Sequence, residues 1–102
     1  MNKIYMEELL EDKGFELVEN ETEQTLVRRV YKKEYSKIEN VAWYGPTETK
    51  FQVYITFVFD QETLRTIRAD YSNGKTKYYD TLSWKRAING IRDTVKYNGF
   101  EL

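Results

Sequence analysis

The residues best placed to do chemistry are four acids near the N-terminus, Glu7, Glu8, Glu11 and Asp12. On a helix, a spacing of four residues would bring Glu7 near Glu11 and Glu8 near Asp12. Paired carboxylates of this kind can bind a divalent cation or exchange protons in catalysis. The same pattern is typical of the solvated face of a helix, and we favour that interpretation.

Other catalytic residue types are scarce. The chain has no histidine and no cysteine, so most pairs of nucleophile and base are excluded. Its serines, Ser36, Ser72 and Ser83, fall in stretches that are typical of turns, loops or helix caps. The sequence also lacks a glycine-rich phosphate loop and the spacing of a zinc or calcium site. We therefore predict a protein without enzymatic activity, cofactor or metal ion.

The elements around the acids follow from hydrophobic periodicity. Residues 51–60 alternate, with Phe51, Val53, Ile55, Phe57 and Phe59 on one face, which predicts a strand buried on that side. Helical spacing predicts an N-terminal helix that ends at Gly14 and a C-terminal helix that ends at Asn98-Gly99. Asn73-Gly74 between two alternating runs indicates a hairpin, so residues 51–80 should form a three-stranded meander. Two further strands are predicted at 15–19 and 24–35, with a polar turn at 20–23.

The predicted fold class is α+β, with an antiparallel sheet of about five strands flanked by the two helices. We expect a single domain over residues 1–102. Two apolar stripes, Ile4/Leu9/Leu10 and Trp84/Ile88/Ile91/Val95, should pack against the Phe51 face and leave Tyr54 and Val58 on the open face. Residues 24–35 carry basic side chains on both faces, as an edge strand does. Residues 36–50 have no clear periodicity and are predicted to form a long loop.

Charge is distributed unevenly along the chain. Residues 1–25 hold two lysines and eight acids, a net charge of 2 − 8 = −6, whereas residues 26–102 hold fourteen basic residues and nine acids, a net charge of 14 − 9 = +5. The two parts either neutralise each other in the fold or form separate surfaces. The N-terminus is acidic, unlike a signal peptide, and no apolar segment reaches the ~20 residues that span a bilayer. We expect a cytoplasmic protein without membrane contact.

Three sets of residues compete as binding surfaces. A carboxylate surface can imitate a phosphate backbone. Basic residues interleaved with tyrosines suit a nucleic-acid backbone. Exposed tryptophan and tyrosine anchor protein interfaces, unless they fold back to cap the core. The sets are the acidic surface Glu7, Glu8, Glu11, Asp12, Glu19, Glu21 and Glu23; the basic set Arg28, Arg29, Lys32, Lys33 and Lys37 with Tyr31 and Tyr35; and the aromatic loop residues Trp43 and Tyr44.

The chain resembles small accessory proteins of phages and mobile elements from low-GC Gram-positive bacteria. The resemblance lies in the acidic opening MEELLEDKGFELVE, the hairpin DYSNGKTKYYDTLSW and the closing helix KRAINGIRDTV. It implies a non-catalytic inhibitor in the bacterial host cytoplasm, of the anti-CRISPR kind, that binds a defence nuclease such as Cas9 or its guide complex and blocks nucleic-acid loading or cleavage. The alternatives are a nucleic-acid-binding regulator that uses Arg28, Arg29, Lys32 and Lys33, and an assembly module. The protein would then be a monomer or a homodimer.

Overall fold

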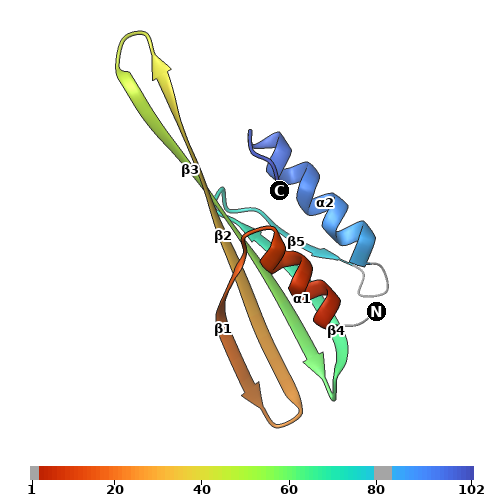
Figure 1. Cartoon of the computed structure of the whole chain (residues 1–102). Helices are drawn as coiled ribbons and strands as arrows, with labels where there is room; N and C mark the ends of the chain where they lie inside the picture. Colours follow the sequence, from red (N-terminus) through yellow and green to blue (C-terminus); the bar gives the residue numbers. More distant parts are fainter. Residues whose placement is uncertain (1–2, 80–83) are drawn as a thin grey trace.

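The computed structural model describes residues 3–79 and 84–102. Two helices flank five consecutive antiparallel strands, which confirms the predicted α+β fold. The elements are α1 (Lys3–Asp12), β1 (Glu16–Glu23), β2 (Leu26–Val41), β3 (Gly45–Asp60), β4 (Thr63–Tyr71), β5 (Thr76–Tyr79) and α2 (Trp84–Tyr97). The molecule is long and narrow, with extents of 55 × 25 × 24 Å, because β2 and β3 run 16 residues each (Figure 1).

The sheet order β1-β2-β3-β4-β5 follows the chain. This confirms the meander that was predicted from residue 51 onward, apart from Asp80, which lies outside the described residues. β2 is not an edge strand along its whole length, because β1 pairs with it from Leu26 to Lys32. Basic side chains on both faces suggested an edge, but the two arginines among them meet acids: Arg28 pairs with Glu19 of β1 and Arg29 with Glu7 of α1.

Both helices pack against the same face of the sheet, as predicted (Figure 1). Phe57 at the centre of β3 is fully buried, between Trp84 of α2 at a ring distance of 5.6 Å and Tyr31 of β2 at 6.1 Å. Met6 and Leu10 of α1 complete the cover. The side chain of Ile4, predicted to join them, lies outside the described part of the chain. The uncovered face holds Tyr54 and Val58, both partly exposed.

Both helices end in the same way. Gly14 and Gly99 have positive φ angles of 92° and 90°. After each glycine, the phenylalanine N–H donates to a carbonyl five residues back, at 2.9 Å for Phe15 and 3.1 Å for Phe100. This is the Schellman arrangement, and it turns both phenylalanine rings toward the core.

The strand β1 is longer than predicted. Residues 20–23 were expected to form a turn, but the strand continues to Glu23 and the turn lies at Gln24-Thr25. The polar composition of this segment suggested a turn, whereas pairing with β2 keeps it extended. Glu19 and Glu21 both lie close to Arg28 on β2, which offsets the repulsion among the acids.

Residues 36–50 are not a loop, which corrects the prediction. They continue β2 and β3 as a two-stranded ribbon, paired from Ser36↔Lys50 to Val41↔Gly45. We call this ribbon the arm, and the rest of the described molecule the body. Periodicity failed here because neither face of the ribbon is apolar, although Thr47 and Thr49 favour strands. Figure 1 shows the arm extending beyond both helices.

Candidate protein-binding surfaces

The two aromatic residues of the predicted loop lie at the very end of the arm. Trp43 is 90% exposed and Tyr44 is 83% exposed, so neither folds back onto the core. The turn that presents them is short: the Tyr44 N–H donates to the Val41 carbonyl at 3.1 Å, and Gly45 follows with a φ of 73°. We call Trp43 and Tyr44 the tip. On β2 the arm runs six residues, from Ser36 to Val41, or about 20 Å of extended chain.

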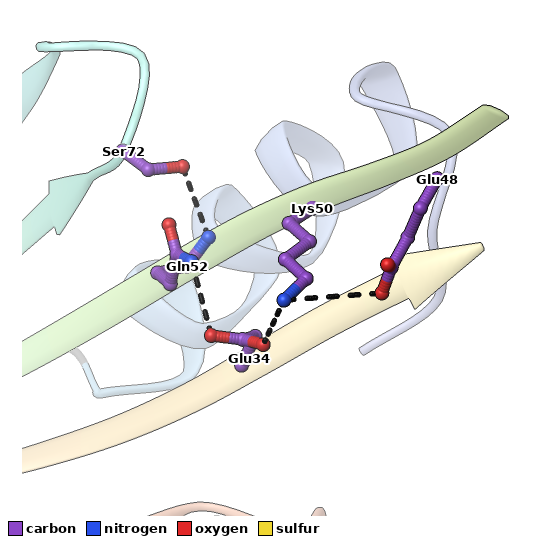
Figure 2. Close-up of polar contacts among 5 residues, drawn as sticks. All are labelled: Glu34, Glu48, Lys50, Gln52 and Ser72. Carbon is purple, nitrogen blue, oxygen red and sulfur yellow. Dashed lines mark hydrogen bonds and ion pairs between the residues drawn. The ribbon is translucent and has the colours of Figure 1, made fainter. Parts of the chain in front are cut away.

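A polar network on the uncovered face holds the base of the arm (Figure 2). The Lys50 ammonium lies 3.9 Å from carboxylates of both Glu34 and Glu48. Gln52 donates its side-chain N–H to Glu34 at 3.0 Å, and its backbone N–H to the Ser72 hydroxyl at 2.9 Å. The Gln52 hydrogen bond, and then Lys50, lowers the pKa of the Glu34 carboxyl. The network therefore ties the arm to the turn after β4.

The structure divides the predicted acidic surface. Glu7 is 9% exposed and pairs with Arg29 at 2.6 Å, so the expectation that it faces solvent is wrong. Burial, and then the charge of Glu7, raise the pKa of the neighbouring Tyr31 hydroxyl. The other six acids are exposed, but on two elements: Glu8, Glu11 and Asp12 on α1, and Glu19, Glu21 and Glu23 on β1.

The two acidic groups also lie on opposite sides of the sheet. Helix α1 covers the core face of the sheet. Glu19 lies opposite Val30 and Glu21 lies opposite Arg28. Because Arg28 and Val30 alternate with the inward residues of β2, these two acids lie on the other face. The Arg28 guanidinium lies 2.5 Å from Glu19 and 3.8 Å from Glu21. The acidic and basic parts of the chain thus interleave, and they do so at the end of the sheet away from the tip (Figure 1).

The basic set is engaged within the fold. Arg28 and Arg29 form the ion pairs just described. The Lys33 ammonium donates at 2.5 Å to the backbone carbonyl of Lys13, the residue that follows α1. The same ammonium lies 4.5 Å from the centre of the Tyr35 ring. Burial, and then the charge of Lys13, lower the pKa of the Lys33 ammonium. Lys32 lies over the Tyr54 ring at 5.4 Å.

Lys37 lies beside the C-terminal end of α2, as Lys33 lies beside that of α1. Its ammonium lies 5.1 Å from the ring of Phe100, just beyond the end of α2, and 3.1 Å from Glu39. A cation at a helix C-terminus is favourable because the helix dipole is negative there. The lysines of β2 thus have a structural role that their sequence pattern did not reveal.

Three comparisons with known proteins found no match. No protein-family model matches the chain, and neither a curated protein sequence nor a solved structure matches it significantly. Within residues 3–79 and 84–102, no helix has the length and apolar character needed to cross a membrane. In the same part of the chain, no three metal-ligating side chains gather into a cluster.

The sequence identified the tip residues but not their presentation. Trp43 and Tyr44 were singled out by residue type alone, while the arm that presents them was taken as irregular. A usable signal was present. Ile38 and Val41 on one side of the turn, and Thr47 and Thr49 on the other, are strand-forming residues, and Gly45-Pro46 between them marks a turn.

Proposed function

We propose that the protein is a non-catalytic protein-binding module that anchors its partner through Trp43 and Tyr44. The observation behind this proposal is their exposure, 90% and 83%, at the end of the arm. Exposing two large aromatic side chains to water is unfavourable, and tryptophan and tyrosine dominate the binding energy of protein interfaces. A narrow ribbon with aromatic residues at its end is suited to insertion into a pocket on a partner.

The charges near the tip favour a protein over a nucleic acid. From Ile38 to Glu48 the arm contains the acids Glu39 and Glu48 and no lysine or arginine. A phosphate backbone would be repelled there. The four basic residues considered for nucleic-acid binding, by contrast, are engaged with acids, a carbonyl or a ring in the body.

For the partner, we propose a bacterial defence nuclease as the first class to test. The resemblance to phage and mobile-element accessory proteins supports this choice. So do the exposed acids of α1, Glu8, Glu11 and Asp12, which can meet lysines and arginines that line a nucleic-acid channel. Binding of this kind would block nucleic-acid loading or cleavage, and it would occur in the cytoplasm of the bacterial host.

The test compares tip variants with a matched control. The double variant Trp43→Ala/Tyr44→Ala removes both rings, and Tyr97→Ala removes a tyrosine that is 87% exposed on α2. Each protein would be immobilised on a resin and incubated with lysate of a low-GC Gram-positive bacterium. In a second experiment, each protein in solution would be added to a Cas9 cleavage assay with guide RNA. Captured proteins would be purified and their Kd values measured. We expect the tip variant to bind at least about 30-fold more weakly than wild type, and Tyr97→Ala to bind normally.

Two outcomes would contradict the proposal. One is a purified partner that binds the tip variant as tightly as wild type, and the other is an equal loss of binding in Tyr97→Ala. A further variant, Glu8→Lys/Glu11→Lys/Asp12→Lys, tests the acids of α1. Its loss of binding should diminish as salt is added, since exposed charges are screened. Glu7 is left unchanged because it pairs with Arg29 in the body.

A further inference from the structure

The outer edge of β2 changes character where the arm begins. β1 pairs with β2 as far as Lys32, and in the described part of the chain no other strand lies along this edge from Lys33 to Val41. An unpaired edge offers backbone N–H and C=O groups to another strand. In the middle of this edge lies Ile38, a large apolar side chain that is 72% exposed.

We propose that a second copy of this chain pairs with the edge, antiparallel, about a two-fold axis at Ile38. In this register Ile38 lies opposite Ile38 of the second copy, and Lys37 lies opposite Glu39 of the second copy. Lys37 and Glu39 already pair along their own strand at 3.1 Å, and the symmetry adds the facing Lys37–Glu39 pair between the copies twice. Ser36 then faces Asn40, and Tyr35 faces Val41. Opposite charges on directly facing residues stabilise such a pair of strands.

Neighbouring registers are excluded by charge. Two facing residues must either both direct their backbone groups toward the other strand or both direct them away from it. Allowed registers therefore differ by two in the sum of the two facing residue numbers. One step in one direction places Lys37 opposite Lys37, and one step in the other places Glu39 opposite Glu39. Like charges directly opposite are destabilising. The alternation of Lys37, Ile38 and Glu39 therefore selects the register centred on Ile38.

The other edges of the described sheet fit a second copy less well. β1 has Glu16, Glu19, Glu21 and Glu23 without a basic residue, so its own copy would be repelled. β5 is four residues long. The outer edge of the arm on β3 has a similar charge pattern about Thr49, but Pro46 lacks an N–H there. The Gln52 N–H on that edge is already donated to Ser72.

The register also has a consequence for the tip. Val41, where β2 ends and the turn to the tip begins, faces Tyr35 of the other copy, so the tip lies near Lys33 of that copy. A hollow of about 410 Å³ lies there, bordered by Gly14, Glu16, Val18, Lys32, Lys33 and Glu34. Val18 in this hollow is 47% exposed and offers an apolar surface to the ring. Pairing of two arms therefore places the tip beside the second copy, where it would compete with another partner for the tip. The dimer rests on the edge of β2 and not on the proposed function.

Sedimentation equilibrium of the purified full chain tests the pairing. We expect a monomer–dimer equilibrium below about 1 mM, and at least tenfold weaker association for both Lys37→Glu and Glu39→Lys. Each single variant places like charges opposite each other. In an equimolar mixture of the two variants the charges match again, so the dimer should return to within a few-fold of wild type. Recovery in the mixture would show that neither variant had misfolded.

Cross-linking tests the register itself. The chain has no cysteine, so Ile38→Cys introduces a single thiol at the two-fold axis. Directly facing residues have Cα atoms about 4.5–5.5 Å apart, within the range of a disulfide. Mild oxidation should give a covalent dimer of Ile38→Cys and much less of the matched control Thr49→Cys on the other edge of the arm.

Several results would overturn the proposal: a wild-type monomer up to about 1 mM, single charge variants that dimerise as well as wild type, or cross-linking of Thr49→Cys in preference to Ile38→Cys. A monomeric wild type that still binds a partner through its tip would overturn the dimer and leave the proposed function standing. A wild-type dimer, together with a tip variant that binds every partner normally, would overturn the proposed function and leave the dimer standing.

Discussion

The arm and the body are built from the same two strands, yet they are stabilised differently. In the body, the inward side of β3 presents Phe51, Val53, Ile55, Phe57 and Phe59, all at most 5% exposed. In the arm, the same side of the ribbon presents Lys37, Glu39, Thr47 and Thr49. The body is held by apolar burial, whereas the arm is held by its backbone ladder and cross-strand polar pairs. A feature maintained without burial points to a role outside the core.

The largest expected difference between the two regions is in the stability lost when an apolar side chain is truncated. Phe57→Ala should lower the free energy of unfolding by about 3–5 kcal/mol, because the fully buried ring contacts Tyr31, Phe59 and Trp84. Ile38→Ala in the arm should change it by less than about 0.5 kcal/mol, since Ile38 is 72% exposed. Urea unfolding of the monomer measures both. Equal losses would show that the arm shares in the folding core.

The next difference is in ion pairs. Arg29→Met leaves the Glu7 carboxylate, 12% exposed in its side chain, without its cation, and should cost about 1–3 kcal/mol. Lys50→Ala in the arm should cost less than about 0.5 kcal/mol, because its side chain is 53% exposed. Adding Glu7→Gln to Arg29→Met should recover part of the loss. If the effects of the two substitutions on the free energy of unfolding were additive, the Arg29–Glu7 pair would not be formed in solution.

Two glycines distinguish the regions in a third way. A Cβ on Gly90 of α2 would lie 2.8 Å from Cε1 of Tyr79, so Gly90→Ala should cost about 1–2 kcal/mol despite the better helix propensity of alanine. Gly45 in the arm has open space around it but a φ of 73°. Gly45→Ala should cost about 1 kcal/mol, and Gly45→Asn less, since asparagine tolerates this φ. Thermal unfolding would check the order; a harmless Gly90→Ala would contradict close packing of α2 on β5.

The last difference concerns pH at the junction of the two regions. Burial raises the pKa of Tyr35 to about 12, from an ordinary value of 10.0. The folded state therefore favours the neutral hydroxyl. Its contribution to stability is complete below pH 10.0 and is lost as the pH rises toward about 12. In Tyr35→Phe the fall in the free energy of unfolding over this range should be shallower than in wild type. Parallel profiles would show that the hydroxyl is solvated.

Much of the fold could be predicted from local pattern. The alternation of residues 51–60 and the stripe from Trp84 to Val95 placed the core strand, the last helix and their contact correctly, because apolar periodicity reports which side is buried. The arm could not be predicted this way, since neither of its faces is buried. The ends of β1 and β2 were missed for the same reason: polar strands have no periodic signal, and only their register with a neighbour keeps them extended.

The candidate surfaces divide along the same line. Composition alone shows which residue types are present: a tryptophan and a tyrosine outside the core pattern, an acidic N-terminal part, and no histidine or cysteine. The folded chain was needed to show that Glu7 is buried against Arg29, that the exposed acids lie on two sides of the sheet, and that Trp43 and Tyr44 lie at the end of an arm. The physical reason is that charge pairing and exposure depend on contacts between distant segments, whereas composition and periodicity are local.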